Sequence, residues 1–344
     1  MKYKLLGKSG LRVSELCLGT LTFGEEWGTG ASREESYKIF DVFVEAGGNF
    51  IDTANYYTGG TSEKIVGECI ARDRDKFVVA TKYTLHNKAG DINSCGNHRK
   101  NLLASLEGSL SRMKTDYVDI LYLHAWDFTT PVEEIMKTLD SLIQSRKVLY
   151  IGISDTPAWI VSQANTLASL RGWESFIALQ IEYSLIERAA ERDLIPMAKA
   201  FEMSILAWGA LGSGLLTGKY NKNNLDNPNY RLKEGSRRFT ERNWKITETV
   251  VATAFELGCK PSHVALNWIR KKNSQIIPII GARSSSQLLD NITALNNELP
   301  DSYYMQLEEV SKIELGFPHD FLESDNIKQV IFGGTYELLE SFRK

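Results

Sequence analysis

The sequence lacks the features that mark several classes of protein. Its cysteines are scattered and show no Cys-x-x-Cys spacing; they are Cys17, Cys69, Cys95 and Cys259. This pattern argues against a zinc site or a disulfide framework and fits a reducing compartment. No run of about 18 apolar residues occurs either, so we expect no membrane span.

An excess of charge of one sign is also missing. The chain carries 40 Lys and Arg against 43 Asp and Glu, a net charge of -3. This balance gives no electrostatic case for binding nucleic acid or an anionic membrane. The N-terminal segment MKYKLLGKSGLRVSELCLG is charged throughout and has no long apolar core, so we expect no signal peptide. We therefore expect a cytoplasmic protein that acts on a small molecule, with its oligomeric state left open.

The two common phosphate-binding loops are absent as well. No Gly-x-Gly-x-x-Gly occurs, which disfavours a Rossmann dinucleotide site. The stretch GALGSGLLTGKY superficially resembles a P-loop, but no glycine stands five residues before Gly218. Tyr220 also replaces the hydroxyl residue that would hold magnesium.

What the 344 residues do contain is a regular alternation of short apolar runs and longer amphipathic stretches. The predicted strands are Glu15–Leu18, Phe50–Thr53, Phe77–Thr81, Val118–Leu123, Tyr150–Ser154, Ala178–Ile181, Ile205–Ala207 and Ile276–Ile279. The predicted helices are Arg33–Ala46, Ser62–Arg72, His98–Met113, Val132–Ser145, Ala158–Leu170, Asp193–Phe201, Trp244–Leu257 and Pro261–Lys271. Apolar strands that alternate with helices indicate a parallel sheet, because parallel strands need crossover helices. Eight such units favour an α/β fold of the closed (β/α)8 TIM-barrel type over an open, doubly wound sheet.

We predict a single domain over residues 1–344, with the barrel at about 15–295 and a C-terminal extension at 296–344. A hairpin around Ser9 and Gly10, formed by Tyr3–Leu6 and Leu11–Val13, could cap the bottom of the barrel. The polar segment Lys219–Asn243 breaks the rhythm, and a loop of that length is usually functional or disordered. The extension should hold a helix at Ser302–Ile313.

Four chemically distinctive residues fall at the ends of neighbouring predicted strands, where a barrel places its active site: Asp52, Tyr57, Lys82 and His124. A tyrosine hydroxyl is a weak proton donor at neutral pH, and a nearby ammonium lowers its pKa. A carboxylate beside the ammonium keeps it charged. This set predicts a general acid aimed at a carbonyl oxygen, with the histidine orienting the substrate.

Each residue has a structural interpretation when taken alone. Asp52 could be a turn or helix cap, Lys82 a solvated strand end and Tyr57 a rim residue packed beside Tyr56. A lone histidine such as His124 is more often structural. The coincidence of all four at adjacent strand ends favours the functional interpretation.

The motifs FIDTANYY, VVATKY, YLHAWD, GISD, LQIEYSLIER, GLLTGKY and IIPIIGARSSSQLLDNI resemble, in order, those of the aldo-keto reductases. The similarity covers nearly the whole chain and looks greatest to the bacterial branch related to potassium-channel β-subunits. It implies reduction of an aldehyde or ketone by hydride transfer from NADPH, with NADH less expected, and no metal. It also implies that Tyr57 is the general acid, Lys82 lowers its pKa, Asp52 pairs with Lys82, and His124 orients the carbonyl.

The resemblance further implies a set of cofactor contacts. Thr20, Leu21 and Asp52 would lie at the nicotinamide end, Ser154, Asp155 and Gln180 would hold the carboxamide, and Trp208 would stack on the ring. Gly209, Ala210, Leu211, Gly212 and Ser213 would wrap the pyrophosphate, although the family often has Ser-Pro-Leu here. Lys219 and Arg231 would clamp phosphates. Gly281, Arg283, Gln287, Asp290 and Asn291 would form the adenosine-phosphate end.

Some of these assignments have alternatives. Trp208 could simply pack at the rim. A helix that begins at Ser284–Ser286 would offer free N–H groups to a phosphate, and Arg283 suits a 2′-phosphate, but Ser284 could only cap that helix. Asp290 is acidic, so we expect it to meet the adenine amine or a ribose.

Two rival functions share these features. A regulatory nicotinamide-binding subunit with little turnover, like the channel β-subunits, has the same fold, but this chain keeps His124, where those subunits typically depart from the family. A Schiff-base aldolase could use Lys82 as its nucleophile. Asp52 beside Lys82 would keep that amine protonated, which weakens the aldolase interpretation.

Overall fold

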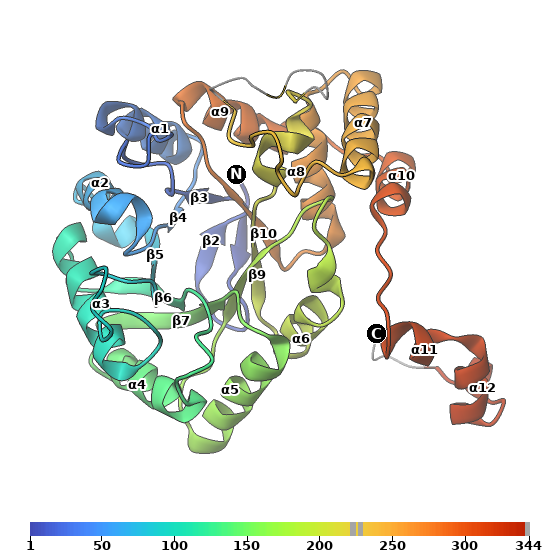
Figure 1. The fold of residues 1–344 in the computed structure, drawn as a ribbon, viewed down its shortest axis with the longest axis horizontal. Helices are drawn as coiled ribbons and strands as arrows, with labels where there is room; N and C mark the ends of the chain where they lie inside the picture. The colour runs from blue at the N-terminus through green and yellow to red at the C-terminus, as the bar shows by residue number, and fades with distance from the viewer. Residues whose placement is uncertain (221–224, 226–229, 341–344) are drawn as a thin grey trace.

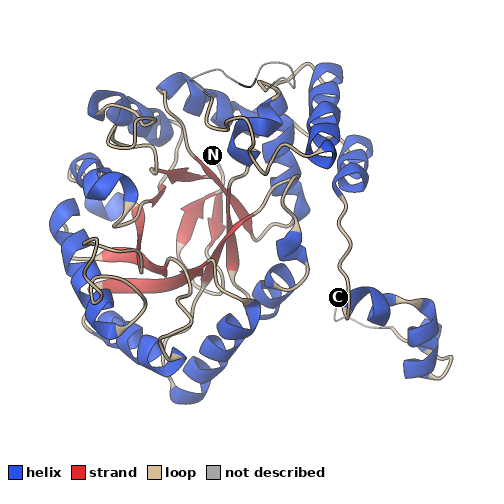
Figure 2. Ribbon diagram, in the orientation of Figure 1, coloured by secondary structure: helices blue, strands red, loops and turns tan. Residues whose placement is uncertain are grey.

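The structure, a computed structural model, describes residues 1–220, 225 and 230–340. Eight parallel strands form a closed barrel in the order β10-β3-β4-β5-β6-β7-β8-β9, which confirms the predicted fold. The strands lie inside a ring of helices (Figure 2). They are β3 (Cys17–Gly19), β4 (Phe50–Asp52), β5 (Val78–Tyr83), β6 (Val118–Leu123), β7 (Val148–Ser154), β8 (Ala178–Glu182), β9 (Ser204–Trp208) and β10 (Ile276–Ile280).

The helices follow the predicted order around the barrel (Figure 1). They are α1 (Arg33–Glu45), α2 (Thr61–Ile70), α3 (Arg99–Met113), α4 (Val132–Gln144), α5 (Ala158–Arg171), α6 (Leu194–Ala200), α7 (Glu241–Glu256), α8 (Pro261–Lys272) and α9 (Ser285–Thr293). Helix α7 begins at Glu241 rather than at the predicted Trp244. The reason is a cap, because the Thr240 side chain accepts a hydrogen bond from the Asn243 N–H.

The predicted hairpin, β1 (Tyr3–Leu5) with β2 (Arg12–Ser14), covers the N-terminal ends of the barrel strands. Lys4 Nζ donates to the Ile276 carbonyl at 3.0 Å, and the Gly7 N–H donates to Ser204 Oγ at 2.7 Å. Both acceptors lie where a strand begins, so the hairpin closes the bottom of the barrel.

Glu15 was predicted to start the first barrel strand, but that strand begins at Cys17. The Glu15 carboxylate instead accepts the Lys2 N–H at 2.7 Å and pairs with Arg270 at 2.6 Å. Glu15 therefore fastens the hairpin to α8.

Side chains inside the barrel are apolar at its lower end and polar at its upper end. Phe50, Val78 and Leu206 belong to the buried lower cluster. Strand side chains alternate between two faces, so steps of two residues from these positions lead upward to Asp52, Lys82 and Trp208. The C-terminal ends of the strands thus point polar groups into one space.

The lower barrel is filled tightly. The Tyr122 ring lies inside it beside Gly152, where an added Cβ would come within 2.2 Å of Tyr122 Cε1. Any larger residue at Gly152 would force the ring to move, so this glycine is required by packing.

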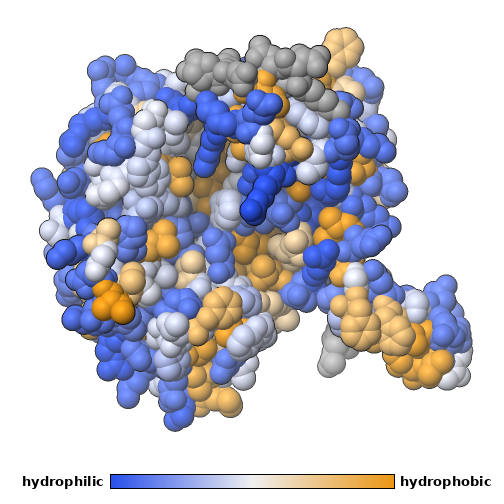
Figure 3. Space-filling model, in the orientation of Figure 1, coloured by the Kyte–Doolittle hydropathy of each residue, from blue (hydrophilic) through white to orange (hydrophobic). Residues whose placement is uncertain are grey.

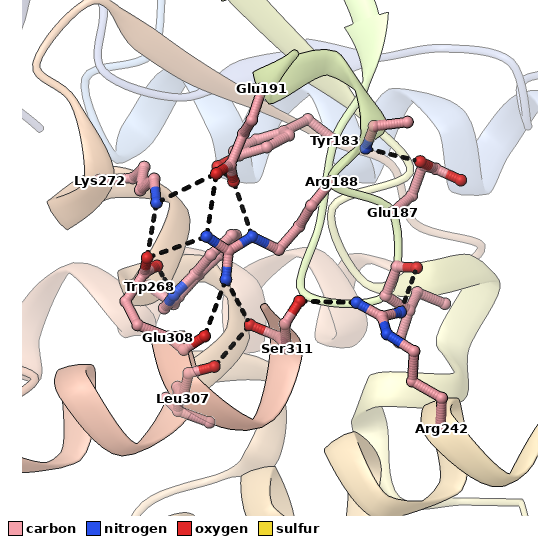
Figure 4. A network of polar contacts seen from close by, with 12 residues as sticks. Tyr183, Glu187, Arg188, Glu191, Arg242, Trp268, Lys272, Leu307, Glu308 and Ser311 are labelled. Carbon is pink, nitrogen blue, oxygen red and sulfur yellow. Dashed lines mark hydrogen bonds and ion pairs between the residues drawn. The ribbon is translucent and has the colours of Figure 1, made fainter. Parts of the chain in front are cut away.

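After α9 the chain forms α10 (Asp301–Ser311). Its bounds are close to those of the predicted helix, Ser302–Ile313. A polar network fastens α10 to the barrel (Figure 4). Buried Arg188 pairs with Glu191 at 2.7 Å and with Glu308 at 2.9 Å, and it donates to Ser311 Oγ at 2.8 Å. Two further short helices, α11 (His319–Glu323) and α12 (Asp325–Phe332), follow α10 and stand clear of the barrel (Figure 1).

Candidate active site

The structure brings the predicted phenol, carboxylate and ammonium together at the top of the barrel. Lys82 Nζ donates to Asp52 Oδ2 at 2.6 Å, to the Thr53 carbonyl at 2.8 Å and to Tyr57 Oη at 3.0 Å. Lys82 and Asp52 come from the ends of β5 and β4, which are paired strands. Tyr57 follows β4 in a turn whose next residues, Thr58 and Gly59, have positive φ values of 48° and 63°. This turn folds the phenol back over the strand ends.

Gln180 also joins this group, and its predicted contact with a cofactor carboxamide stays a prediction. Its Nε2 donates to Asp52 Oδ1 at 2.8 Å, so the Asp52 carboxylate is held on one oxygen by an amide and on the other by Lys82. The sequence assigned Gln180 to a cofactor carboxamide, and a position on β8 gave no signal of its contact across the barrel with Asp52.

The pKa of Tyr57 differs from the simple expectation. Burial raises the pKa of the Tyr57 phenol, while the Lys82 charge lowers it and the Asp52 charge raises it again. The net direction is upward, so the phenol is protonated at neutral pH. For Lys82, burial lowers the pKa but Asp52 and Tyr57 raise it, and the net direction is also upward. The Tyr57 hydroxyl is therefore protonated and can act as a proton donor beside the charged Lys82 ammonium.

His124 follows β6 and lies edge-on to Tyr57, with ring centroids 5.9 Å apart. Burial lowers its pKa to about 3, and the Lys82 charge contributes in the same direction. The imidazole is thus neutral. Its Nδ1 has no hydrogen-bond partner within the part of the chain that the structure describes.

Aromatic side chains surround the mouth above Tyr57. Trp27, from the loop after β3, lies 6.5 Å from the Tyr57 ring and 5.7 Å from the Tyr56 ring. His86 packs edge-on against Tyr56 at 5.0 Å. Tyr56 was not among the predicted site residues. The only signal for Tyr56 is its place next to the catalytic candidate.

Several of the predicted cofactor residues line the same rim. Ser154 is buried at the end of β7, and its Oγ has no hydrogen-bond partner among the described residues. Trp208 ends β9, and its Nε1 donates to Asp155 Oδ1 at 3.2 Å, which fixes the indole beside the barrel mouth. An orphaned hydroxyl next to an oriented indole fits the carboxamide and ring of a nicotinamide.

The segment after β9 turns sharply, as a phosphate-binding backbone would. Gly209, Gly212, Ser213 and Gly214 all have positive φ values. Ala210 and Gly212 are buried, and Leu211 and Ser213 are half-buried. Such successive left-handed residues form concave runs of backbone that suit anions.

Three predicted cations gather beyond this turn. Burial lowers the pKa of Lys219, and the charges of Arg283 and Arg231 lower it further. Both arginines therefore lie within electrostatic range of Lys219, although Arg283 comes from a distant part of the chain. Like charges repel, so a cluster of this kind suits a phosphate-rich ligand.

Other predicted residues are engaged elsewhere. The Thr20 hydroxyl is buried and contacts the Asp52 carbonyl at 2.9 Å and Ser62 Oγ at 2.8 Å, leaving Leu21 half-buried at the rim. Asp290 pairs with Lys260 at 2.7 Å. The predicted contact of Asp290 with an adenine or ribose stays a prediction beside this ion pair.

The start of α9 also differs from the prediction of free N–H groups. Ser284 caps the helix by accepting the Gln287 N–H at 3.2 Å. Glu35, from α1, accepts the Ser285 N–H at 2.6 Å and the Ser285 hydroxyl at 2.9 Å. A carboxylate of the chain itself therefore holds one of the donors. Of the remaining predicted residues here, Gly281 is exposed, Asn291 is buried, and Gln287 Oε1 accepts the Arg283 N–H at 3.0 Å.

Arg238, in the same polar segment as Arg231, pairs with Glu182 at the end of β8. Part of the long polar segment, residues 221–224 and 226–229, lies outside the described residues. Across residues 1–220, 225 and 230–340, no cluster of three or more His, Cys, Asp and Glu side chains could hold a metal ion. No helix within these residues is long and apolar enough to cross a membrane.

Comparisons with known proteins identify the family to which the chain is similar. The profile of the aldo/keto reductase family matches residues 15–312. Norsolorinic acid reductase from Aspergillus flavus is 38% identical over 92% of this chain and 83% of its own length. A putative aryl-alcohol dehydrogenase from Saccharomyces cerevisiae is 37% identical over 94% and 90%, and an aryl-alcohol dehydrogenase from Pestalotiopsis microspora is 38% identical over 93% and 85%. These relatives are fungal, and they correct the prediction of a bacterial branch related to potassium-channel β-subunits.

Proposed function

This chain belongs to the aldo/keto reductase family of oxidoreductases, and from that premise we propose that it reduces aryl aldehydes or ketones reversibly with NADPH. The observation that carries the proposal is the contact chain from Asp52 through Lys82 to Tyr57, at 2.6 and 3.0 Å. The aryl preference is supported by the aromatic mouth of Trp27, Tyr56 and His86 and by the names of two relatives.

The cofactor would lie across the C-terminal rim. Ser154 and Asp155 would hold the carboxamide, Trp208 would stack on the nicotinamide, and Gly209–Ser213 would receive the pyrophosphate. Lys219, Arg231 and Arg283 would bind the adenosine phosphates, which favours NADPH over NADH. When bound, the reduced nicotinamide supplies a hydride to the carbonyl carbon.

The chain's own residues would hold the proton and donate it to the carbonyl oxygen. Tyr57 Oη carries a proton at neutral pH because its pKa is raised, so it can donate to the carbonyl oxygen as charge develops there. Lys82 then stabilises the phenolate left behind, and Asp52 and Gln180 keep Lys82 in place. Neutral His124 would orient the same oxygen by a hydrogen bond without adding charge.

Replacement of Tyr57 tests the proposal. Tyr57→Phe should lower kcat for benzaldehyde reduction by roughly 10²–10⁴-fold, because it removes the general acid. The rate is followed by the loss of reduced-nicotinamide absorbance, and NADPH affinity, measured by fluorescence titration, should be nearly unchanged. Tyr56→Phe is the matched control, since it removes a neighbouring hydroxyl that does not contact Lys82. An undiminished rate in Tyr57→Phe, or a loss of NADPH binding in parallel with the rate, would assign Tyr57 a different role.

A further inference from the structure

The C-terminal arm, residues 314–340, is the part of the chain that the proposed reaction does not use. It leaves α10 as an extended segment and carries α11 and α12 away from the barrel (Figure 1). Much of its surface is apolar in the space-filling view (Figure 3). An apolar projection of this kind on a folded protein needs a physical explanation.

The base of the arm is fixed to the barrel. Arg192 donates to the Glu314 carbonyl from Nε at 3.3 Å and from Nη2 at 3.0 Å. His319 Nε2 contacts Asp193 Oδ1 at 3.2 Å. These contacts sit in the loop before α6, so they set the direction in which the arm departs.

Beyond this base, the apolar side chains of the arm face solvent. Nine large apolar residues between Phe317 and Leu339 are at least 36% exposed. The exposed fraction reaches 84% at Phe317, 72% at Val330 and 82% at Leu338. Covering nine such side chains would remove on the order of 800 Å² per arm from water, whereas exposed apolar patches on monomers rarely exceed about 300–600 Å².

The composition of the arm argues against a membrane as its partner. Residues 314–344 carry six carboxylates against three cations, Lys328, Arg343 and Lys344. Helices that lie on membranes are typically rich in Lys and Arg on their polar face. The arm's helices are also short, with five residues in α11 and eight in α12.

The area favours a second copy of the same chain. Soluble oligomers are mostly symmetric, and in a two-fold dimer each partner would receive the other's arm. Two reciprocal arms and the surfaces they cover would bury roughly the 1,600 Å² of a standard stable interface or more. We propose that the C-terminal arm docks on the barrel of a second copy, so that the protein is an arm-exchanged homodimer.

Sedimentation velocity of the full chain over a range of concentrations tests this proposal. The wild type should sediment as a dimer. The double variant Val330→Asp, Ile331→Asp places two charges on the exposed face of α12 and should raise the dimer dissociation constant at least 100-fold. Leu170→Asp is the matched control: this leucine is 81% exposed on α5, outside the arm, and its change should leave the dimer intact.

The other outcomes overturn the proposal. A wild type that stays monomeric at every concentration shows that the arm has no second copy to dock on. A dimer that survives the double variant shows that another surface holds the two copies together. Flotation of the wild type, but not the double variant, with phosphatidylcholine vesicles would assign the arm to a lipid surface instead. Circular dichroism and benzaldehyde turnover of each variant verify that the barrel remains folded.

Discussion

At the scale of single residues, Asp52 is the side chain that holds the buried polar groups of the candidate site in place. Its two oxygens hold the Lys82 ammonium and the Gln180 amide, and all three groups are buried. A buried ammonium that loses its carboxylate keeps its desolvation cost with no compensating attraction. The catalytic arrangement and the stability of the upper barrel therefore depend on the same side chain.

We expect Asp52→Asn to destabilise the protein by about 3–5 kcal/mol, because it leaves Lys82 buried and uncompensated. The free energy of unfolding is measured by urea denaturation. Adding Lys82→Met removes the stranded charge, so the double variant should recover part of that loss. If Asp52→Asn costs less than about 1 kcal/mol, the ammonium has another source of compensation.

His124 gives a prediction about pH. Its pKa is about 3 in the folded protein, below the ordinary value of about 6.5 for the unfolded chain. The unfolded state therefore binds a proton that the folded state does not, so this group lowers stability as the pH falls from 6.5 toward 3. Between pH 6.5 and 5 we expect His124→Gln to lose roughly 1–2 kcal/mol less stability than the wild type.

Urea unfolding at the two pH values measures this difference, and other titrating groups cancel in the comparison. His86→Gln, which removes an imidazole at the mouth, is the control and should follow the wild type. Identical pH dependence in His124→Gln and the wild type would show that His124 takes up its proton equally in both states.

At the scale of elements, the approach to α9 is where we expect the choice between NADPH and NADH to be made. Arg283 precedes the helix, and its charge and that of Arg231 both act on Lys219, so this corner is cationic. Glu35 from α1 holds the Ser285 N–H and hydroxyl at the first turn. We therefore expect the Arg283 guanidinium, rather than the helix N-terminus, to bind a 2′-phosphate.

Arg283→Ala should weaken NADPH binding by roughly 10-fold or more while changing NADH binding much less, because a hydrogen bond between charged groups contributes about 1.5–3 kcal/mol. Fluorescence titration with each cofactor gives the two dissociation constants. Lys260→Ala is the matched control, since this cation pairs with Asp290 on α9 instead. Equal losses for both cofactors in Arg283→Ala would remove the 2′-phosphate assignment.

At the scale of the whole molecule, the Arg188 network joins the loop after β8 to α8 and α10 (Figure 4). Lys272 reaches Glu308 at 2.6 Å, and the Trp268 indole donates to the same carboxylate at 2.8 Å. The network ties the start of the C-terminal extension to the barrel, so it also supports the base of the arm.

Arg188→Met should cost about 3–5 kcal/mol in the free energy of unfolding, because two partly buried carboxylates lose their shared partner. Guanidinium denaturation measures the change. The control is Arg171→Met, whose ion pair with Glu133 is exposed on both sides and should contribute less than about 1 kcal/mol. Similar small effects in both variants would show that Lys272 alone neutralises the cluster.

The sequence by itself determined the barrel and the meeting of Asp52, Tyr57, Lys82 and His124. Strand and helix periodicities are local, and the ends of parallel strands share one rim, so order along the chain predicts proximity. The sequence also led to the three cations, with Lys219 and Arg231 assigned together and Arg283 assigned separately.

Only the tertiary structure decided the pKa values of those residues and the contacts they make. The upward pKa of Tyr57, the contact of Gln180 with Asp52, and the capture of Ser285 by Glu35 depend on burial and on neighbours far apart in sequence. The exposure of the arm was also decided only by the tertiary structure. Whether an apolar residue is covered depends on where the rest of the chain, or another copy of it, lies. Desolvation and long-range contacts have no period along the sequence, and for that reason no local pattern reveals them.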